Sequence, residues 1–183
     1  WYVYTATPPG QERRFSSDLV GDVIRSFTLT LWNVYSFFIT YANLDKPQAL
    51  TVTAPTNDLD RWLLSELNVL VRDVTNAYET YDVTNATRPV EKFVETLSTW
   101  YVRRSRRRFW KSESDGDKNA AYATLYEALV TVSKLLSPTM PFLADALYQN
   151  LVRAADPEAA ESVHLTDWPE YMPALVNDDL NRE

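Results

Sequence analysis

The sequence predicts an all-α fold, a bundle of about five helices followed by an irregular C-terminal tail. Over several long stretches, apolar side chains recur at intervals of three and four residues, the period of a helix that buries one face. Only three glycines occur in 183 residues, and polar stretches containing proline separate the apolar ones. A chain of this length can bury a sizeable core, and its length alone favours one domain.

The first long helix is predicted over residues 17–43, after a connector over residues 1–15. Ser16, Ser17 or Asp18 can cap its N-terminus, because a short polar side chain there accepts a bond from a free backbone N–H. Its inward face is the apolar series Leu19, Val23, Phe27, Leu31, Val34, Phe38 and Tyr41. Trp32 is expected to belong to the core as well.

A long connection over residues 45–57 leads to a second helix, predicted over residues 59–81. Trp62, near its start, is expected in the core. Its apolar side chains fall within an arc of about 120° at 3.6 residues per turn, so one face is buried. These side chains are Leu63, Leu67, Leu70, Val71, Val74, Ala77, Tyr78 and Tyr81.

A third helix is predicted from Thr84, as its cap, to residue 110. Pro89 lies beyond the first turn, where it removes a hydrogen bond, so a delayed start or a kink is expected. A polar loop over residues 112–118 follows, and Asp117 is the expected cap of a fourth helix, which a Ser-Pro pair ends. The buried stripe of that helix is Ala121, Leu125, Ala128, Leu129, Val132, Leu135 and Leu136.

A fifth helix, capped by Thr139, has Pro141 near its first position, where a missing N–H costs little. It is expected to end near Val152. Beyond it the chain is predicted to be irregular, with a short extended piece at residues 163–165 and a further helix opening at residues 177–183. The predicted organisation is therefore a connector (1–15), a helical bundle (16–153) and a tail (154–183).

The charge pattern singles out residues 100–111, where six of the 18 Lys and Arg are gathered among four aromatic residues. The rest of the chain holds 12 basic residues against 25 acidic ones. Arginine and aromatic side chains together suit RNA, since the charges meet phosphates and both planar groups stack on unpaired bases.

On a helical wheel, Arg103, Arg107 and Lys111 share one outward line, and Trp100 lies one turn before it. Arg104 and Arg108 flank that line, and either could instead pair with acidic residues of neighbouring helices. The expected RNA-contacting residues are Trp100, Arg103, Arg104, Arg106, Arg107, Arg108, Trp110 and Lys111.

Other interpretations of this segment remain open. Val102 and Phe109 are expected to point into the core. The segment could simply be a solvated helix end, where the helix dipole favours cations near the C-terminus. A nuclear-localisation or heparin-type patch is another interpretation, which the helical phase and the flanking rings disfavour. If RNA binds, about five single-strand phosphate contacts would weaken binding about a hundredfold between about 50 and 200 mM salt.

The composition excludes several kinds of functional site, because the residues that they require are absent or nearly absent. It contains no cysteine and one histidine, His164, which excludes disulfides and Cys-ligated zinc within it and leaves almost nothing for a Ser-His-Asp site. The most apolar stretch, residues 29–44, is shorter than the roughly 20 residues of a membrane span. The start lacks an initiator Met and a signal peptide, so we expect a segment of a longer polypeptide.

The arginine run and seven other stretches resemble one family. These stretches are residues 14–20, 29–38, 41–45, 60–65, 81–84, 120–126 and 138–144, with a further likeness at 162–169. Together they are similar to the isoleucyl-tRNA synthetases, of the clade that holds archaeal and eukaryotic cytosolic enzymes and some bacterial ones. The resemblance covers about residues 1–176, and the related valyl enzymes lack such an arginine run.

The resemblance implies a helical bundle of the class I anticodon-binding type, docking on the anticodon stem-loop of the isoleucine tRNA. Neither ATP signature of that class, His-x-Gly-His or Lys-Met-Ser-Lys-Ser, occurs in the sequence. The resemblance, together with the absence of these signatures, therefore implies a fragment with no catalytic residue, metal or cofactor of its own. ATP and Mg would serve the catalytic part of the parent enzyme, and any zinc would lie in its other regions.

The same resemblance implies a cytoplasmic protein, a monomer without a membrane partner. The editing domain would lie upstream and a C-terminal extension would follow residue 183. The alternative function is a helical protein-interaction bundle whose arginine-rich end docks an acidic partner.

Overall fold

The structure is a computed structural model that describes residues 1–47, 50–52, 57–111 and 115–182. All regular secondary structure in this part of the chain is helical, which confirms the predicted all-α class. The α-helices are α1 (Tyr2–Thr5), α2 (Ser17–Val23), α3 (Leu29–Asp45), α4 (Asp58–Glu79), α5 (Val83–Thr96), α6 (Arg103–Trp110), α7 (Gly116–Leu136) and α8 (Pro141–Tyr148).

Three π-helical segments join or extend these helices. Ile24–Thr28 links α2 to α3, Leu97–Val102 links α5 to α6, and Gln149–Arg153 extends α8. The described chain therefore contains five long helical runs, as predicted, and the third of them ends at Trp110.

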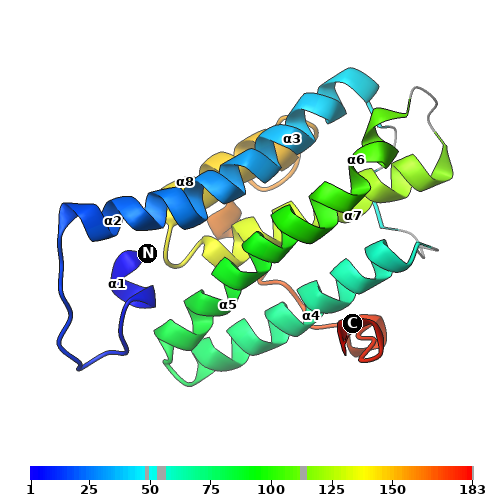
Figure 1. The fold of residues 1–183 in the computed structure, drawn as a ribbon. Coiled ribbons are helices and arrows are strands. Elements are labelled where there is room, and N and C mark those ends of the chain that lie inside the picture. The colour runs from blue at the N-terminus through cyan, green and yellow to red at the C-terminus, as the bar shows by residue number, and fades with distance from the viewer. Residues whose placement is uncertain (48–49, 53–56, 112–114, 183) are drawn as a thin grey trace.

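Figure 1 shows how the runs pack. The continuous rod of α2 and α3 lies across the top, and α4 and α5 form an antiparallel hairpin below it. α6 continues the line of α5 to the far end of the bundle, where it packs against α7. α8 packs back on α7, and α1 lies at the opposite end from α6.

Two helix caps show where the local sequence sufficed and where it did not. Ser16 caps α2, since its hydroxyl accepts from the backbone N–H of Leu19 at 3.3 Å, as one of the three expected options. The expectation for Thr84 was wrong. Asp82 caps α5 by accepting from the N–H of Asn85 at 3.0 Å, and Thr84 is buried inside the first turn.

The caps of the next two helices also differ from the prediction. Asp115 rather than Asp117 caps α7, because its carboxylate accepts from the N–H of Lys118 at 2.7 Å. Thr139 does not cap α8, which has no side-chain cap, whereas Pro141 occupies the expected first position. Several short polar residues lie within two or three positions of these starts, so the local sequence leaves the choice among them open.

Pro89 lies inside α5, which begins at Val83, so of the two expected effects, a delayed start or a kink, the delayed start was wrong. The neighbouring Val90 is 1% exposed and Phe93 is 5% exposed. Tertiary packing of this face against α4 therefore holds the helix through the proline.

The predicted stripes supply most of the core, although Leu19, Val23, Tyr41 and Tyr78 are only partly buried. All seven stripe residues of α7 are buried, as are Phe27, Leu31, Val34 and Phe38 of the first run. Tyr81 was expected on the inward face but is 90% exposed, because α4 ends at Glu79 and Tyr81 takes a left-handed conformation. The core expectation for Trp32 was also wrong, since it is 52% exposed, and Trp62 is only partly buried.

The C-terminal tail is irregular, as predicted, apart from 3-10 turns at Val163–Leu165, Pro173–Leu175 and Leu180–Arg182. The first of these replaces the expected extended piece. The tail runs back along α4 and is hydrogen-bonded to polar side chains on one face of that helix. In these hydrogen bonds Trp168 Nε1 donates to Thr75 Oγ1 (2.8 Å), Met172 N to Asn68 Oδ1 (3.0 Å) and Asn177 N to Ser65 Oγ (2.8 Å).

The connector is also packed on the bundle. The Trp1 ring stacks on Phe27 at a centroid distance of 4.6 Å, and the Arg13 guanidinium donates to the carbonyls of Val3 and Thr7. Parts of the predicted connection (48–49 and 53–56) and of the predicted polar loop (112–114) lie outside the described residues.

Candidate nucleic-acid interface

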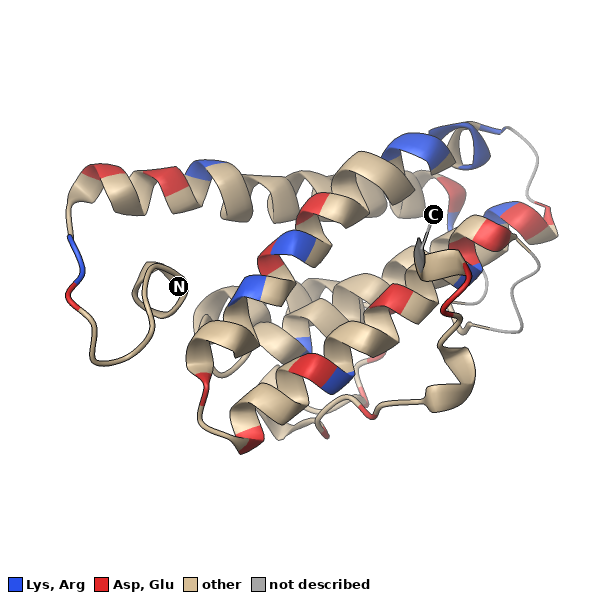
Figure 2. Ribbon diagram, turned by 60° about the horizontal axis from the view of Figure 1, so that its bottom comes forward, with Lys and Arg blue, Asp and Glu red and all other residues tan. Residues whose placement is uncertain are grey.

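Five arginines gather on α6, at one end of the bundle. Figure 2 shows them on α6, whereas acidic residues are distributed over the other helices. Val102 and Phe109 point inward, with 5% and 1% exposure, as the helical wheel predicts. The Phe109 ring makes edge contacts with Phe37 at 5.1 Å and Tyr122 at 4.8 Å, so α6 is anchored by its apolar side.

Four arginines of α6 have exposed side chains: Arg103, Arg104, Arg106 and Arg107. None of the four forms an ion pair with another residue in the described part of the chain. Their charges therefore face solvent uncompensated, in a protein whose net charge is −7. We call these four residues the arginine face.

Arg108 does not belong to this face, contrary to the predicted set of RNA-contacting residues. Its side chain is buried and points into the bundle, where Nη1 donates to Asp60 Oδ1 at 2.7 Å and Nη2 to Asp60 Oδ2 at 2.6 Å. Nη2 also lies 2.9 Å from a carboxylate oxygen of Asp117. Arg108 thus pairs with acidic residues of neighbouring helices, which was the alternative expected for it. Its guanidinium is therefore unavailable to a phosphate.

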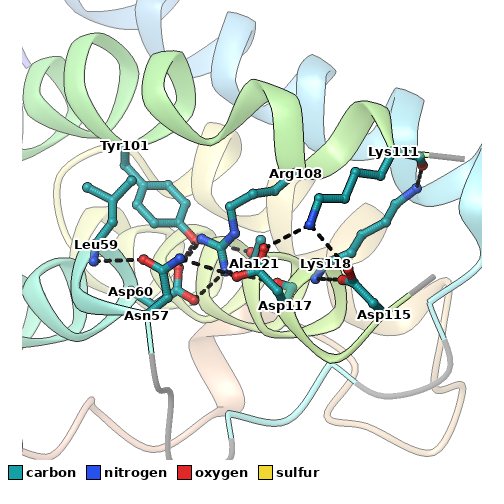
Figure 3. Close-up of polar contacts among 10 residues, drawn as sticks. All are labelled: Asn57, Leu59, Asp60, Tyr101, Arg108, Lys111, Asp115, Asp117, Lys118 and Ala121. Carbon is teal, nitrogen blue, oxygen red and sulfur yellow. Dashed lines mark hydrogen bonds and ion pairs between the residues drawn. The ribbon is translucent and has the colours of Figure 1, made fainter. Parts of the chain in front are cut away.

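Asp60 is the centre of a buried polar network that Figure 3 displays. Its carboxylate is fully buried and also accepts from the Tyr101 hydroxyl at 2.7 Å. Removing a carboxylate from water is costly unless it is paired and hydrogen-bonded, and this one has three donors. The network fixes the end of α6 to the start of α4.

The electrostatics of this network follow from its burial. Burial by itself lowers the pKa of the Arg108 guanidinium, but the hydrogen bonds and charge of Asp60 outweigh it and raise that pKa above its ordinary value. Burial raises the pKa of the Tyr101 phenol well above its ordinary value, and the Asp60 carboxylate raises it further. Arg108 therefore stays charged and Tyr101 stays neutral.

A second set of contacts holds Lys111, the last cation of the predicted outward line. Its ammonium pairs with Asp115 at 3.1 Å and Asp117 at 3.4 Å, at the start of α7. Beside it, the buried ammonium of Lys118 pairs with Asp45 at 2.7 Å and donates to the Lys111 carbonyl at 2.6 Å. Lys111 is half-exposed and already compensated, so it differs from the four residues of the arginine face.

Two tryptophans flank the arginine face. Trp100 is 46% exposed, and the Arg104 guanidinium lies over its ring at 4.0 Å from the centroid. Trp110 is 55% exposed, and its indole N–H donates to the Tyr41 hydroxyl at 2.7 Å, which fixes the ring. Exposed, oriented rings beside uncompensated arginines form the combination that unpaired bases and their phosphates require.

Sequence reasoning missed Asp60 as a site residue, although a signal was present. Asp60 continues the buried stripe of α4, three positions before Leu63, and is thus an acidic residue at an inward position. Such a position requires a buried cation as a partner. The sequence did not show which of the arginines of the distant third run would supply it.

The described ranges contain neither a metal cluster nor a membrane span. No group of three or more His, Cys, Asp or Glu among these residues is arranged to hold a metal ion. None of the described helices combines the length and apolar character needed to cross a membrane.

Comparison with known proteins gives consistent results. The family model described as the anticodon-binding domain of tRNA ligase matches residues 60–183. The chain is 59% identical to isoleucine–tRNA ligase of Dehalococcoides mccartyi (strain ATCC BAA-2266), with 100% of this chain and 18% of that protein covered. The isoleucine–tRNA ligase of Thermus thermophilus (strain ATCC 27634) is 55% identical, over 98% of this chain and 18% of that protein.

The chain thus spans about a fifth of the length of these curated relatives. Among solved structures, LeuRS of Agrobacterium radiobacter K84, in a ternary complex with tRNA and LeuAMS, matches 96% of this chain and 19% of that one. The TM-score is 0.68 at 15% identity, which shows a shared fold. Since the family model covers more than half of the sequence, the chain belongs to the family of anticodon-binding domains of tRNA ligases.

Proposed function

We propose that this chain is the anticodon stem-loop binding domain of an isoleucine–tRNA ligase. The observation that carries the proposal is the arginine face, four uncompensated arginines between two exposed tryptophans at one end of an acidic bundle. The curated relatives named isoleucine–tRNA ligase support the choice of isoleucine tRNA as partner.

The proposed RNA-contacting residues are Trp100, Arg103, Arg104, Arg106, Arg107 and Trp110, with Lys111 at the margin. The arginines would meet phosphates of the anticodon stem-loop, and the rings would stack on bases that the loop leaves unpaired. Arg108 acts indirectly, since its pair with Asp60 fixes the helix that carries the others.

In the parent protein, this domain would position the tRNA for aminoacylation with isoleucine. The ATP- and Mg-dependent reaction, and any zinc, would belong to other regions of that longer enzyme, because this sequence carries neither ATP signature of the class. The domain boundaries would be those predicted, a connector (1–15), a bundle (16–153) and a tail (154–183). We also propose a cytoplasmic, monomeric enzyme. Its clade would be the one that joins archaeal and eukaryotic enzymes with some bacterial ones, and the relatives reported above are bacterial.

The proposal is tested by measuring the dissociation constant of the chain for an isoleucine-tRNA anticodon stem-loop and for an unrelated stem-loop. The cognate stem-loop should bind more tightly. With about four phosphate contacts, binding should weaken about fifty-fold between about 50 and 200 mM salt. Equal affinity for both stem-loops and for an acidic peptide would overturn it in favour of the protein-interaction alternative.

A further inference from the structure

A groove with a volume of about 580 Å³ runs beside α6, between that helix and α4. We call it the tryptophan groove and define it by six of its lining residues, Leu59, Trp62, Glu66, Trp100, Arg104 and Asn181. Three separate elements contribute to it: α4, the end of the third helical run, and the last 3-10 turn of the tail. Its volume is in the range of about 300–1,000 Å³ typical of sites for small organic groups.

The apolar side of the groove is built from planar groups. Trp100 is nearly half exposed, Trp62 is partly buried, and the guanidinium of Arg104 lies over the Trp100 ring at 4.0 Å from its centroid. Nucleic-acid bases bind to surfaces of this kind, because every base has a π-face that stacks on an aromatic ring or a guanidinium plane.

The polar side of the groove offers acceptors. Glu66 forms no hydrogen bond or ion pair in the described part of the chain. Burial raises the pKa of its carboxyl group, and the nearby charge of Lys92 lowers it in part. The neighbouring carboxylate of Asp58 already pairs with Arg61 at 3.0 Å. The side-chain oxygen of Asn181 is buried and therefore out of reach of a ligand, so Glu66 is the acceptor that the groove presents.

These two sides select among the bases. A carboxylate binds most strongly to two donors that lie next to each other, as it does with a guanidinium. The Watson–Crick edge of guanine carries such a pair, its ring N1–H and its exocyclic amino group. The corresponding edges of adenine, cytosine and uracil each carry one donor position beside acceptors, which a carboxylate would repel.

We propose that the tryptophan groove binds one unpaired guanine of an RNA, stacked on its planar side and hydrogen-bonded to Glu66. The proposal rests on the function proposed above, since the arginine face next to the groove would hold the backbone of the same RNA. Arg104 belongs to both surfaces and joins them.

The experiment uses RNA hairpins whose seven-nucleotide loop consists of uridines, with one guanosine placed at each loop position in turn. Matched hairpins carry adenosine or inosine instead, and inosine lacks only the amino group of guanosine. The dissociation constant of the chain for each hairpin is measured by fluorescence anisotropy. Guanosine in at least one position should strengthen binding about ten-fold over the all-uridine loop, the size of one good base contact, and inosine should lose most of this gain.

Three variants locate the effect. Glu66→Gln should abolish the guanosine preference while retaining binding to the all-uridine hairpin. Trp100→Leu should also abolish the preference, and it should weaken binding to every hairpin, because Trp100 is one of the proposed RNA-contacting residues. Glu95→Gln removes an exposed carboxylate of α5 that lies outside the groove, and it should retain the preference. Circular dichroism of each variant confirms that it is folded.

The outcomes separate this inference from the proposed function. Salt-sensitive binding of all hairpins without a guanosine preference would overturn the groove and leave the arginine face intact. A preference that persists in Glu66→Gln would also overturn the groove. If no hairpin binds at any salt concentration, the proposed function fails and the groove inference fails with it.

Discussion

Arg108 on α6 and Asp60 on α4 lie 48 residues apart in the sequence and form a bidentate ion pair inside the bundle, with N–O distances of 2.7 and 2.6 Å. The pair fastens the end of the arginine-rich helix to the beginning of the second run. It also separates Arg108, which is buried, from Arg107, which faces solvent.

Breaking this pair should destabilise the fold. Asp60→Asn would leave the buried Arg108 charge without its anion, and loss of one partner of a buried pair costs about 3–5 kcal/mol. Urea unfolding should show a lower midpoint with an unchanged slope. The matched control is Asp58→Asn, whose side chain is 78% exposed in its pair with Arg61, and the same midpoint shift in both variants would contradict a special role for Asp60.

Reversing a charge on the arginine face should weaken RNA binding without unfolding the domain. Arg107 is exposed and has no ion pair among the described residues, so Arg107→Glu should leave the melting temperature nearly unchanged. Its affinity for the anticodon stem-loop should fall at least ten-fold, because attraction to a phosphate becomes repulsion. Arg25→Glu, in the π-helical segment that joins α2 to α3 and outside the arginine face, is the control and should bind like the unmodified chain.

The dependence of the RNA affinity on salt concentration should reveal the number of phosphate contacts. Each contact with single-stranded RNA contributes about 0.7 to the slope of log affinity against log salt concentration, so the double variant Arg103→Gln, Arg107→Gln should lower that slope by about 1.4. The slope is obtained from dissociation constants at several salt concentrations. An Arg108→Gln variant that retains its fold should keep the full slope, and a reduced slope there would show that Arg108 contacts RNA.

Stability should fall at alkaline pH, partly through Tyr101. Burial and the adjacent Asp60 raise the pKa of its phenol in the folded state. The unfolded chain therefore loses this proton first, and the contribution of Tyr101 is complete below about pH 10 and declines as the pH rises further. Tyr101→Phe should make the decline shallower by up to about 1.4 kcal/mol per pH unit, as measured by urea unfolding between about pH 8 and pH 11. Parallel curves for the variant and the unmodified chain would contradict this account.

The tail should detach from α4 when its central fastening is removed. Asn68 is buried, and its amide oxygen accepts from the backbone N–H of Met172 at 3.0 Å. Asn68→Ala leaves that donor unpaired, at a cost of about 1–3 kcal/mol, and hydrogen exchange at Met172 should accelerate. Thr80→Ala, an exposed substitution at the end of the same helix, should not change the exchange rate at Met172.

Much of the fold is encoded locally. The stripe of α7 predicted its buried face completely, and Pro141 was placed correctly, because apolar periodicity and proline geometry act within a few residues. The caps were less predictable: Asp115 and Asp117 lie two positions apart, and both can accept from a helix N-terminus. Asp115 caps α7, while Asp117 contacts Arg108 and Lys111 instead. The π-helical segments have no distinct side-chain period and were not predicted.

The sequence by itself determined that this protein is a helical bundle and that its positive charge gathers on one helical end. Only the tertiary structure decided which of those charges is available. Arg107 and Arg108 are neighbours of the same residue type, and the difference between them depends on Asp60, which belongs to another helix. A buried carboxylate must take a cation from whatever the fold brings within about 3 Å, and helical periodicity carries no information about contacts across 48 residues.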